Sequence, residues 1–347
     1  MQRSRFFSLL VLAGLGLAIG TTQYAFAATQ ITGAGASFPF PFYSRAFYEY
    51  GRLHPDVQVN YQSIGSGGGI QQFTAKTVDF GASDVPLNAN EMKAAVASGG
   101  DVVEFPTTIG GVVVAYNVPG APTHIKLDQP TLANIFLGEI TNWNDAAIAK
   151  TNAGANLPNL SIVVAHRADG SGTTYIFTDY LSKISPEWKT KVGNAKVVNW
   201  PAASSVGAKG NEGVAGTIKN TPGAIGYVEL AYALQTDITY AALRNSSGAF
   251  VAPSVDTVRE AAEQKPNVSP DDFSIVDMTG KGTYPIAGYS WVMLWKNQPD
   301  SNKGKQLVNL FRWVVTDGQP YAERLRYVGL PKSIQAQNAK VLAGVKT

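Results

Sequence analysis

Apolar residues recur along the chain with two different periods, and each period predicts one kind of element. Phe42, Tyr43, Ala46, Phe47 and Tyr50 lie at spacings of three and four, which is typical of the buried face of a helix. The same spacing predicts helices over residues 42–50, 70–76, 91–97, 131–137, 145–150, 173–181, 186–192, 214–220, 255–263, 305–316, 321–325 and 333–342. Period-two alternation or a short apolar run predicts strands over residues 30–34, 57–62, 78–82, 110–116, 160–165, 224–228 and 291–296.

Strands that alternate with helices predict an α/β protein with mostly parallel sheets. Residues 110–116 read GGVVVAY, a continuous apolar run typical of a buried parallel strand, whereas residues 207–213 are predicted to be a loop. Loops rich in glycine and polar residues follow four predicted strands, and they comprise residues 35–38, 65–69, 83–84 and 170–173. Ligands of such sheets bind beyond the carboxyl ends of the strands, so these loops could converge on one crevice.

The loop with the most chemistry lies in residues 165–175, AHRADGSGTTY. Its backbone N–H groups open a predicted helix and have no partners within it, and the helix dipole favours an anion there. Arg167 adds a planar fork of donors that suits a tetrahedral oxyanion. The alternative is an ordinary turn, capped by Ser171 or Thr173, in which Arg167 and Asp169 pair at the surface.

Two loops nearer the N-terminus add further donors. Ser66 stands in the glycine run 65–69 before a helix, so its hydroxyl and its N–H can both donate to an oxyanion. The alternative is a flexible loop in which the glycines only permit the turn. Ser37 is a similar donor, and Phe38 either excludes water from the site or is an ordinary core aromatic.

Asp84 places a carboxylate among these anion-binding loops, which suits only an anion that carries a proton. Phosphate is protonated near neutral pH and can donate to an ionised Asp84. Sulfate is not protonated, so the same carboxylate would repel it and exclude it from the site. The alternative is that Asp84 caps a turn at residues 86–88.

The N-terminus predicts a cleavable signal peptide, residues 1–27. Two arginines precede an apolar stretch at 6–19 that is too short to span a membrane, and residues 25–27, AFA, fit a cleavage site. An uncleaved anchor is the alternative. The chain has no cysteine and hence no lipoprotein tether, so we expect a free protein of a bacterial periplasm.

The composition excludes several classes of function. The 347 residues are 45% hydrophobic, which is enough for one large core or two ordinary ones. Without Arg3 and Arg5, 26 basic residues face 25 acidic ones, a balance that argues against binding to nucleic acid or anionic membranes. His54, His124 and His166 lack metal-ligand spacing, and neither a P-loop nor a G-x-S-x-G motif occurs. We therefore predict neither an enzyme nor a bound metal or other cofactor.

Seven segments spread along the chain match the motifs of a known family. They are TGAGASFP at 32–39, YQSIGSGGG at 61–69, VDFGASD at 78–84, FPTTIGGVV at 105–113, RADGSGT at 167–173, KGN at 209–211 and PGAIGYVE at 222–229. Together they resemble the periplasmic phosphate-binding proteins of bacterial high-affinity phosphate ABC importers. The resemblance runs from about residue 29 to about residue 330.

The resemblance implies a phosphate site without metal, in which backbone N–H groups, hydroxyls, one arginine and one aspartate hold the anion. Carried over by motif, the binding residues are Ser37, Phe38, Ser66, Asp84, Arg167, Ser171, Gly172 and Thr173. Asp84 would accept the proton of the phosphate, and Asp169 would orient Arg167. Ser37 stands where the family commonly has threonine; it keeps the hydroxyl and lacks only the methyl group.

The family fold, a type II periplasmic binding protein, has two α/β lobes, with the ligand in the cleft between them and a hinge of two crossings. On this chain the crossings are expected near residues 108–111 and 285–288. One lobe would then be discontinuous, comprising residues 28–109 and 287–347, and the other would comprise residues 110–286. Binding would close the two lobes over the anion.

The resemblance also implies partners. The chain would be a monomer that binds inorganic phosphate and delivers it to the membrane permease of the importer, which works with a cytoplasmic ATPase. One alternative is a binding protein of the same fold for sulfate, molybdate or a phosphonate. A more distant alternative is a secreted phosphatase or esterase that uses Asp84 as a base.

Overall fold

The computed structural model describes residues 28–347, so the predicted signal peptide lies outside the described residues. The strands are β1 (Thr29–Gly35), β2 (Val57–Ser63), β3 (Phe80–Ser83), β4 (Val102–Tyr116), β5 (Lys126–Leu127), β6 (Val163–Arg167), β7 (Ser205–Ala208), β8 (Ala224–Glu229), β9 (Thr239–Tyr240), β10 (Ala242–Arg244), β11 (Phe250–Val251) and β12 (Ala287–Trp295). The helices are α1 (Phe40–Leu53), α2 (Ser66–Thr74), α3 (Ala89–Gly99), α4 (Gln129–Leu137), α5 (Ala146–Thr151), α6 (Gly172–Ile184), α7 (Pro186–Lys191), α8 (Gly210–Asn220), α9 (Leu230–Thr236), α10 (Val255–Glu263), α11 (Ser301–Val314), α12 (Gln319–Arg324) and α13 (Lys332–Ala343).

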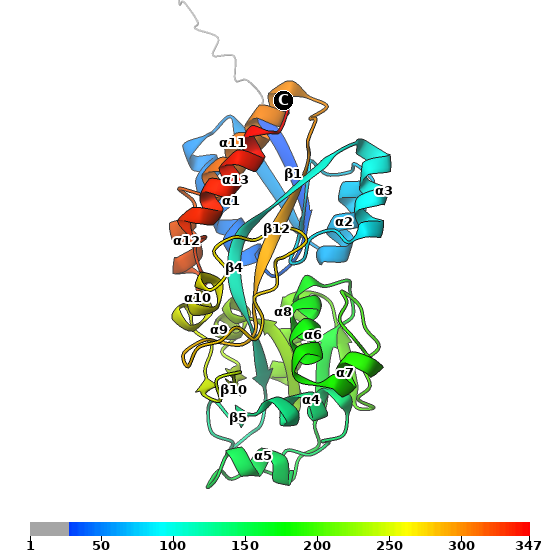
Figure 1. Ribbon diagram of the computed structural model, residues 1–347, viewed down its shortest axis with the longest axis vertical. Helices are drawn as coiled ribbons and strands as arrows, with labels where there is room; N and C mark the ends of the chain where they lie inside the picture. The colour runs from blue at the N-terminus through cyan, green and yellow to red at the C-terminus, as the bar shows by residue number, and fades with distance from the viewer. Residues whose placement is uncertain (1–27) are drawn as a thin grey trace, which may run out of the picture.

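Two α/β lobes are stacked along the long axis of the molecule (Figure 1). One nine-stranded sheet runs through both, in the order β2-β1-β3-β12-β4-β8-β6-β7, with β9 also paired to β4. We call the half that contains β1, β2, β3 and β12 the upper lobe, and the half that contains β6, β7 and β8 the lower lobe. A small three-stranded sheet, β11-β10-β5, belongs to the lower lobe.

Helices cover both faces of the sheet in the upper lobe. On one face α1 and α11 pack on the strands, and the ring of Phe47 meets those of Phe80 and Phe311 at 5.9 and 6.4 Å. On the other face Phe73 of α2 stacks on Trp295 of β12, with ring centroids 4.3 Å apart. The apolar spacing of residues 42–50 predicts the first of these contacts, because it places Phe47 on the buried side of α1.

The lower lobe repeats this arrangement with different helices. Val112 and Val114 of β4 face the core formed with α4 and α6, where Phe136 and Phe177 meet edge to face. Val113 and the following alternate residues face α8 and α9 on the opposite side, against Val214. Within residues 28–347, no helix is both long enough and apolar enough to cross a membrane.

Strand β4 belongs to both lobes. Up to Gly111 it pairs with β12, and from Val112 onward it pairs with β8, antiparallel in both cases. The prediction of a parallel strand over 110–116 is therefore wrong. Helices cover both faces of β4, and burial on both faces produces an apolar run whatever the direction of the neighbouring strands.

The prediction of mostly parallel sheets holds only at the two flanks. β1 pairs parallel with β2 and β3, and β6 pairs parallel with β7 and β8. In the centre, β12 and β4 are antiparallel to each other and to their other partners β3 and β8. The sheet is mixed because the chain crosses between the lobes and returns.

The prediction of a loop over 207–213 is also wrong. β7 extends to Ala208, and α8 begins at Gly210, whose φ of +69° turns the chain directly from strand to helix. β7 lies at the edge of the sheet with Val206 44% exposed, so it shows no apolar pattern. Helix α9 and the short strands β5, β9, β10 and β11 also escape prediction, the strands because two or three residues carry no period.

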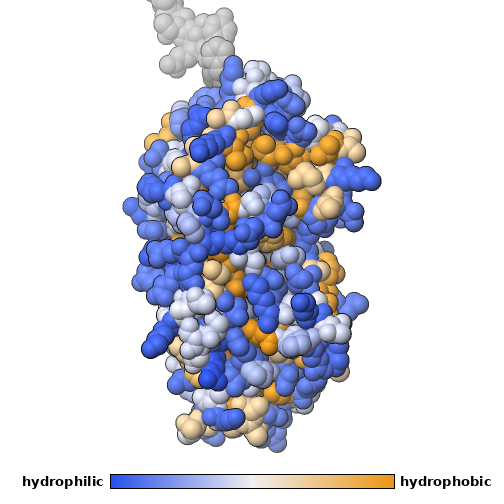
Figure 2. Space-filling model, in the orientation of Figure 1, coloured by the Kyte–Doolittle hydropathy of each residue, from blue (hydrophilic) through white to orange (hydrophobic). Residues whose placement is uncertain are grey.

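Polar side chains dominate the surface. Figure 2 shows that hydrophilic residues cover most of the visible face, with apolar residues between them mainly over the upper lobe.

Candidate functional site

Four polar loops converge between the lobes. β1, β2 and β3 run parallel, so the loops that follow them leave the same edge of the sheet, and the loop after β6 meets them from the lower lobe. Ser66 Oγ joins three of the loops, because it accepts the N–H groups of Asp84 at 3.2 Å and Gly172 at 3.0 Å. The first loop is held to the lower lobe through Ser37 Oγ, which accepts the N–H of Asn211 at 3.1 Å.

The two lobes touch backbone to backbone at glycines. The N–H of Gly67 donates to the carbonyl of Gly170 at 2.8 Å. A Cβ at Gly67 would lie 3.1 Å from the Cα of Gly170, and one at Gly172 would lie 2.5 Å from the Cβ of Asp84. These glycines therefore permit an approach of the loops that a side chain would prevent.

Arg167 is the buried cation of the cleft. It is the last residue of β6 and is 5% exposed, and its Nε donates to Asp169 Oδ1 at 2.7 Å while Nη2 donates to Oδ2. Burial alone would lower the pKa of Arg167, but the hydrogen bond and charge of Asp169 raise it above its ordinary value. The alternative of a surface pair is wrong, because the pair lies inside the cleft, where the N–H of Gly210 also donates to Asp169.

Asp84 is the buried carboxyl group of the cleft, 2% exposed. Burial raises its pKa to about 7, although the hydrogen bond from Ser290, the charge of Arg167 and the donors of Thr173 act in the opposite direction. Ser290 Oγ donates to Asp84 Oδ1 at 2.8 Å. The alternative role as a cap for the turn at 86–88 is not observed, since the N–H of Leu87 donates to Glu104 and Asp84 Oδ1 accepts from Ser290. At neutral pH this carboxyl group can either accept or donate a proton.

Ser37 and Phe38 form the wall of the cleft that is contributed by the first loop. Both are buried, and two tyrosines hold their backbone: Tyr232 donates to the carbonyl of Ser37 and Tyr327 to that of Phe38, each at 2.6 Å. The Phe38 ring lies against Gly110, where a Cβ would come within 2.7 Å of it. The ring also belongs to the hydrophobic core, which agrees with the alternative of an ordinary core aromatic, and its role at the anion stays a prediction.

Ser171, Gly172 and Thr173 bring the start of α6 to the cleft. Ser171 caps the helix, because its Oγ accepts the N–H of Thr174 at 3.0 Å, and its own N–H donates to the carbonyl of Lys196 at 2.9 Å. What Ser171 can offer an anion is therefore its hydroxyl proton. The first turn of α6 points the positive end of the helix dipole at the same place.

Comparisons with known proteins place the chain in a family. Residues 20–317 match the PBP superfamily domain. The phosphate-binding protein PstS of Xylella fastidiosa is 44% identical over 311 residues, which cover 89% of this chain and 83% of that protein. The phosphate-binding protein PstS of Haemophilus influenzae is 43% identical over 323 residues, covering 92% and 93%. The chain belongs to the PstS family of phosphate-binding proteins.

Solved structures share the PstS-type fold at lower identity. A phosphate-binding protein from Stenotrophomonas maltophilia matches with a TM-score of 0.70 at 19% identity, over 89% of this chain and 93% of its own. A high-affinity periplasmic phosphate-binding protein, solved with phosphate bound, matches with a TM-score of 0.70 at 20% identity, over 92% and 99%. These similarities establish the two-lobed fold.

The site of this PstS family member includes residues that sequence reasoning missed. Ser290, which bonds Asp84, comes from β12, and its only signal is that it is the one hydroxyl-bearing serine or threonine in the apolar run AGYSWVMLW. Asn211 lies in the matched segment KGN, but its residue type alone indicates no role. Lys196 Nζ pairs with Glu91 Oε2 at 2.5 Å, joining the segment after α7 to α3 of the upper lobe. No sequence spacing links such distant residues.

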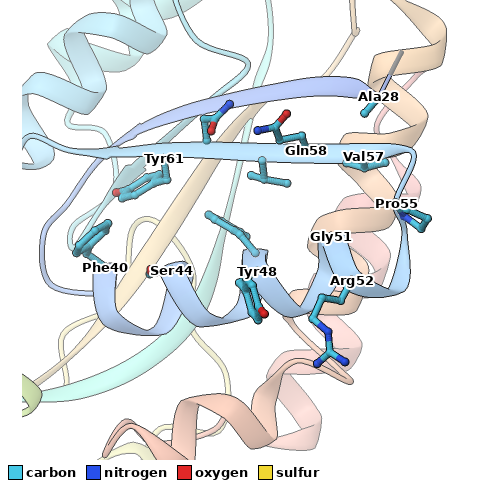
Figure 3. Close-up of a pocket in the computed structure, with 13 residues that line it drawn as sticks. Ala28, Phe40, Ser44, Tyr48, Gly51, Arg52, Pro55, Val57, Gln58 and Tyr61 are labelled. Atoms are coloured by element: carbon cyan, nitrogen blue, oxygen red, sulfur yellow. The ribbon is translucent and has the colours of Figure 1, made fainter. Parts of the chain in front are cut away.

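A groove also lies on the upper lobe, and it touches the first loop through Tyr61, whose hydroxyl donates to the carbonyl of Ala36 at 2.8 Å. It runs between α1 and β2, has a volume of about 550 Å³, and is flanked by Phe40, Tyr48 and Tyr61 (Figure 3). Arg52 also lines the groove, and its Nη1 pairs with Glu49 Oε2 at 3.2 Å. The groove brings aromatic rings and an open strand edge together but no set of converging donors.

Proposed function

We propose that this PstS-family protein binds inorganic phosphate between its lobes and delivers it to the permease of an ABC importer. One observation carries the proposal: a buried cation, Arg167, and a buried carboxyl group with a pKa near neutrality, Asp84, meet among hydroxyl and N–H donors. The names of the relatives, phosphate-binding protein PstS, support the same ligand.

The proposed contacts are those expected from the loops. Ser37, Ser66, Ser171 and Thr173 would donate hydroxyl protons, and N–H groups of the loop that carries Phe38 would add to them, whereas the N–H of Gly172 is held by Ser66 Oγ. Removing phosphate from water costs several kcal/mol, which is offset only when nearly every oxygen is bonded. Hydrogen bonds to a charged group contribute about 1.5–3 kcal/mol each, so several of them support micromolar or tighter binding.

Asp84 would select the anion. Phosphate keeps a proton near neutral pH, so an ionised Asp84 can accept a hydrogen bond from it, and a protonated Asp84 can donate to the more highly charged form. Sulfate carries no proton, so an ionised Asp84 meets it with an unpaired lone pair and a like charge. The raised pKa of Asp84 supports this role because it matches the range in which phosphate itself titrates.

The proposed lobes comprise residues 28–109 with 287–347, and residues 110–286. The change of partner along β4, from β12 to β8 between Gly111 and Val112, supports a hinge near 108–111. The N–H of Val112 donates to the carbonyl of Ile286 at 2.8 Å, which supports the second crossing beside the first. The bond from the N–H of Gly67 to the carbonyl of Gly170 across the lobes supports a closed arrangement, in which Arg167 lies at the loops of the upper lobe.

We place the protein in the periplasm as a monomer released from its signal peptide. The structural relative described as a high-affinity periplasmic phosphate-binding protein supports this compartment. In the proposed cycle the loaded protein docks on membrane permease subunits, and the cytoplasmic ATPase drives release. No enzymatic step and no cofactor enters the proposal.

The test is calorimetric titration of refolded, phosphate-stripped mature protein at pH 7.5, first with phosphate and then with sulfate. Tight one-to-one phosphate binding without sulfate heat is expected. Equal binding of both anions would overturn the ligand and the role of Asp84. Turnover of a chromogenic phosphate ester by the same preparation would favour the phosphatase alternative, and we expect none.

A further inference from the structure

Asn211 is a fully buried amide, 0% exposed, that contacts two of the proposed phosphate donors. Its Nδ2 donates to Ser37 Oγ at 3.0 Å and to Thr173 Oγ1 at 3.1 Å, and its backbone N–H also donates to Ser37 Oγ. Its Oδ1 accepts the backbone N–H of Glu229 at 2.9 Å. Every polar atom of the side chain is therefore in use.

The orientation of this amide follows from its neighbours. The N–H of Glu229 can only donate, so the atom that faces it must be the amide oxygen of Asn211. The NH₂ group then faces Ser37 and Thr173, and both of its protons point at hydroxyl oxygens. The polarity of this group is thus set by a backbone N–H that cannot reverse.

The N–H donors around Ser37 and Thr173 fix the direction in which each hydroxyl can donate its proton. A hydroxyl oxygen has two lone pairs, and Ser37 Oγ receives two N–H groups of Asn211. Thr173 Oγ1 receives Asn211 and, at 3.4 Å, Nη1 of Arg167. Both hydroxyls are filled as acceptors, so each must offer its proton to another group, and in the protein without the anion Thr173 donates toward Asp84.

Ser66 is held in the same way by different partners. Its Oγ accepts two backbone N–H groups, those of Asp84 and Gly172, and so it too can only donate its own proton. The side chains of Ser37, Ser66 and Thr173 therefore behave as donors alone. Of Ser37, Ser66, Thr173 and Asp84, only Asp84 therefore keeps acceptor capacity.

We propose that Asn211 is a positioning residue that orients the hydroxyls of Ser37 and Thr173 as proton donors toward the bound anion. The inference rests on the proposed function, since the anion is the phosphate of that proposal. Ser37 belongs to the upper lobe and Asn211 to α8 of the lower lobe, so the orientation is complete only when the lobes meet. Asn211 thereby links closure of the cleft to the direction of its hydrogen bonds.

The first test replaces Asn211 with aspartate, which has the same shape and can still accept the N–H of Glu229. An aspartate oxygen would face Ser37 and Thr173 and draw their protons away from the cleft, so we expect phosphate affinity to fall at least about 100-fold. Asn211→Ala should lower it about 10-fold, because the hydroxyls are then free to turn. Asn220→Asp, at the exposed far end of α8, is the matched control and should bind as wild type does.

A second test separates orientation from the added charge. If Asn211 acts through the two hydroxyls, Asn211→Ala should change affinity less than about twofold in a Ser37→Ala/Thr173→Val background. We measure the effect of Asn211→Ala on phosphate affinity in the wild type and in the double variant. The difference between the two effects excludes any loss of affinity caused by the unpaired N–H of Glu229. Thermal unfolding identifies variants that fail to fold, in which case Asn211→Ser replaces Asn211→Ala.

The outcomes are distinct. Wild-type protein that does not bind phosphate overturns the proposed function and this inference together. If wild type binds phosphate and Asn211→Asp binds it with unchanged affinity, the inference alone is overturned. The inference alone is also overturned if Asn211→Ala still lowers phosphate affinity 10-fold in the Ser37→Ala/Thr173→Val background. The inference is supported if Asn211→Asp loses phosphate affinity and if the effect of Asn211→Ala disappears in the Ser37→Ala/Thr173→Val background.

Discussion

The cleft between the lobes and the groove between α1 and β2 differ in the properties that decide what each can bind. The groove is open, about 550 Å³ in volume, and flanked by aromatic rings (Figure 3). The side chain of Arg52 in the groove is 65% exposed and pairs with Glu49. In the cleft Arg167 and Asp84 are almost fully buried, and the loops around them are joined by hydrogen bonds. The groove therefore offers space and aromatic surface, whereas the cleft offers buried charges and directed hydrogen-bond donors.

The difference between the cleft and the groove shows how a binding site for a small anion can be identified in a structure. The direction of the hydrogen-bond donors that line a site is more informative than the volume of the site. Burial makes each charge expensive, so the protein pairs Arg167 with Asp169 and supports Asp84 with Ser290. An exposed arginine such as Arg52 is under no such constraint. The predictions below test whether phosphate binding depends on the cleft and not on the groove.

Arg167→Ala should have the largest effect. It removes the buried cation and leaves Asp169 as an unpaired negative charge beside the anion, so phosphate binding should weaken by about 2–5 kcal/mol, or at least 30-fold. Calorimetric titration measures this loss. Arg52→Ala in the groove is the matched control and should leave the affinity unchanged; an equal loss in the two variants would contradict the comparison.

Asp84→Asn should stabilise the phosphate-free protein at high pH. Burial raises the pKa of Asp84 from 3.8 to about 7, so its contribution to stability is fully present below pH 3.8 and is lost as the pH rises through about 7. Relative to wild type, the variant should therefore gain up to about 4 kcal/mol at pH 8 and little at pH 4. Urea unfolding at the two pH values measures the gain. The exposed Asp56→Asn, beside the groove, is the matched control in the same measurement.

Asp84→Asn should also change specificity. The amide cannot accept the phosphate proton as well as a carboxylate does, so phosphate affinity should fall about 10-fold, while sulfate binding should become measurable. Lowering the pH to 5 should have a similar effect on wild type, because Asp84 is then protonated and can donate to sulfate. Undetectable sulfate binding under both conditions would remove Asp84 as the discriminator.

Tyr48→Ala should have the smallest effect. The side chain lies at the groove with 60% exposure, so phosphate affinity should stay within about twofold and stability within about 0.5 kcal/mol of wild type. Titration and thermal unfolding of this one variant measure both quantities. A large loss of phosphate affinity would mean that groove and cleft are coupled.

Sequence reasoning predicted the fold class and most helices and strands, because apolar periodicity records which face of an element is buried. It failed where the burial of a strand does not determine which strands pair with it or in which direction they run. Residues 110–116 are apolar whether their neighbours run parallel or antiparallel, so the central position of β4 between β12 and β8 could not be deduced. Edge strand β7 failed for the opposite reason, since exposure left it without a pattern.

The candidate site was predictable in part. Loops after parallel strands must leave one edge of a sheet, so grouping Ser37, Ser66 and Asp84 follows from topology, and their role in binding stays a prediction. Ser290 and Asn211 could not be found in this way. Each acts through a contact with a residue more than a hundred positions away, and no local pattern encodes such a contact.

The place of β12 in the sheet has a consequence for the order of folding during synthesis. β12 lies between β3 and β4, so the upper lobe lacks a central strand until residues 287–295 have left the ribosome. The N-terminal third of the chain cannot complete its hydrophobic core before that point, whereas the segment from β5 to β11 needs only β4 and itself. Pairings between segments so far apart in sequence form slowly, and the upper lobe would therefore complete its core last, after the lower lobe.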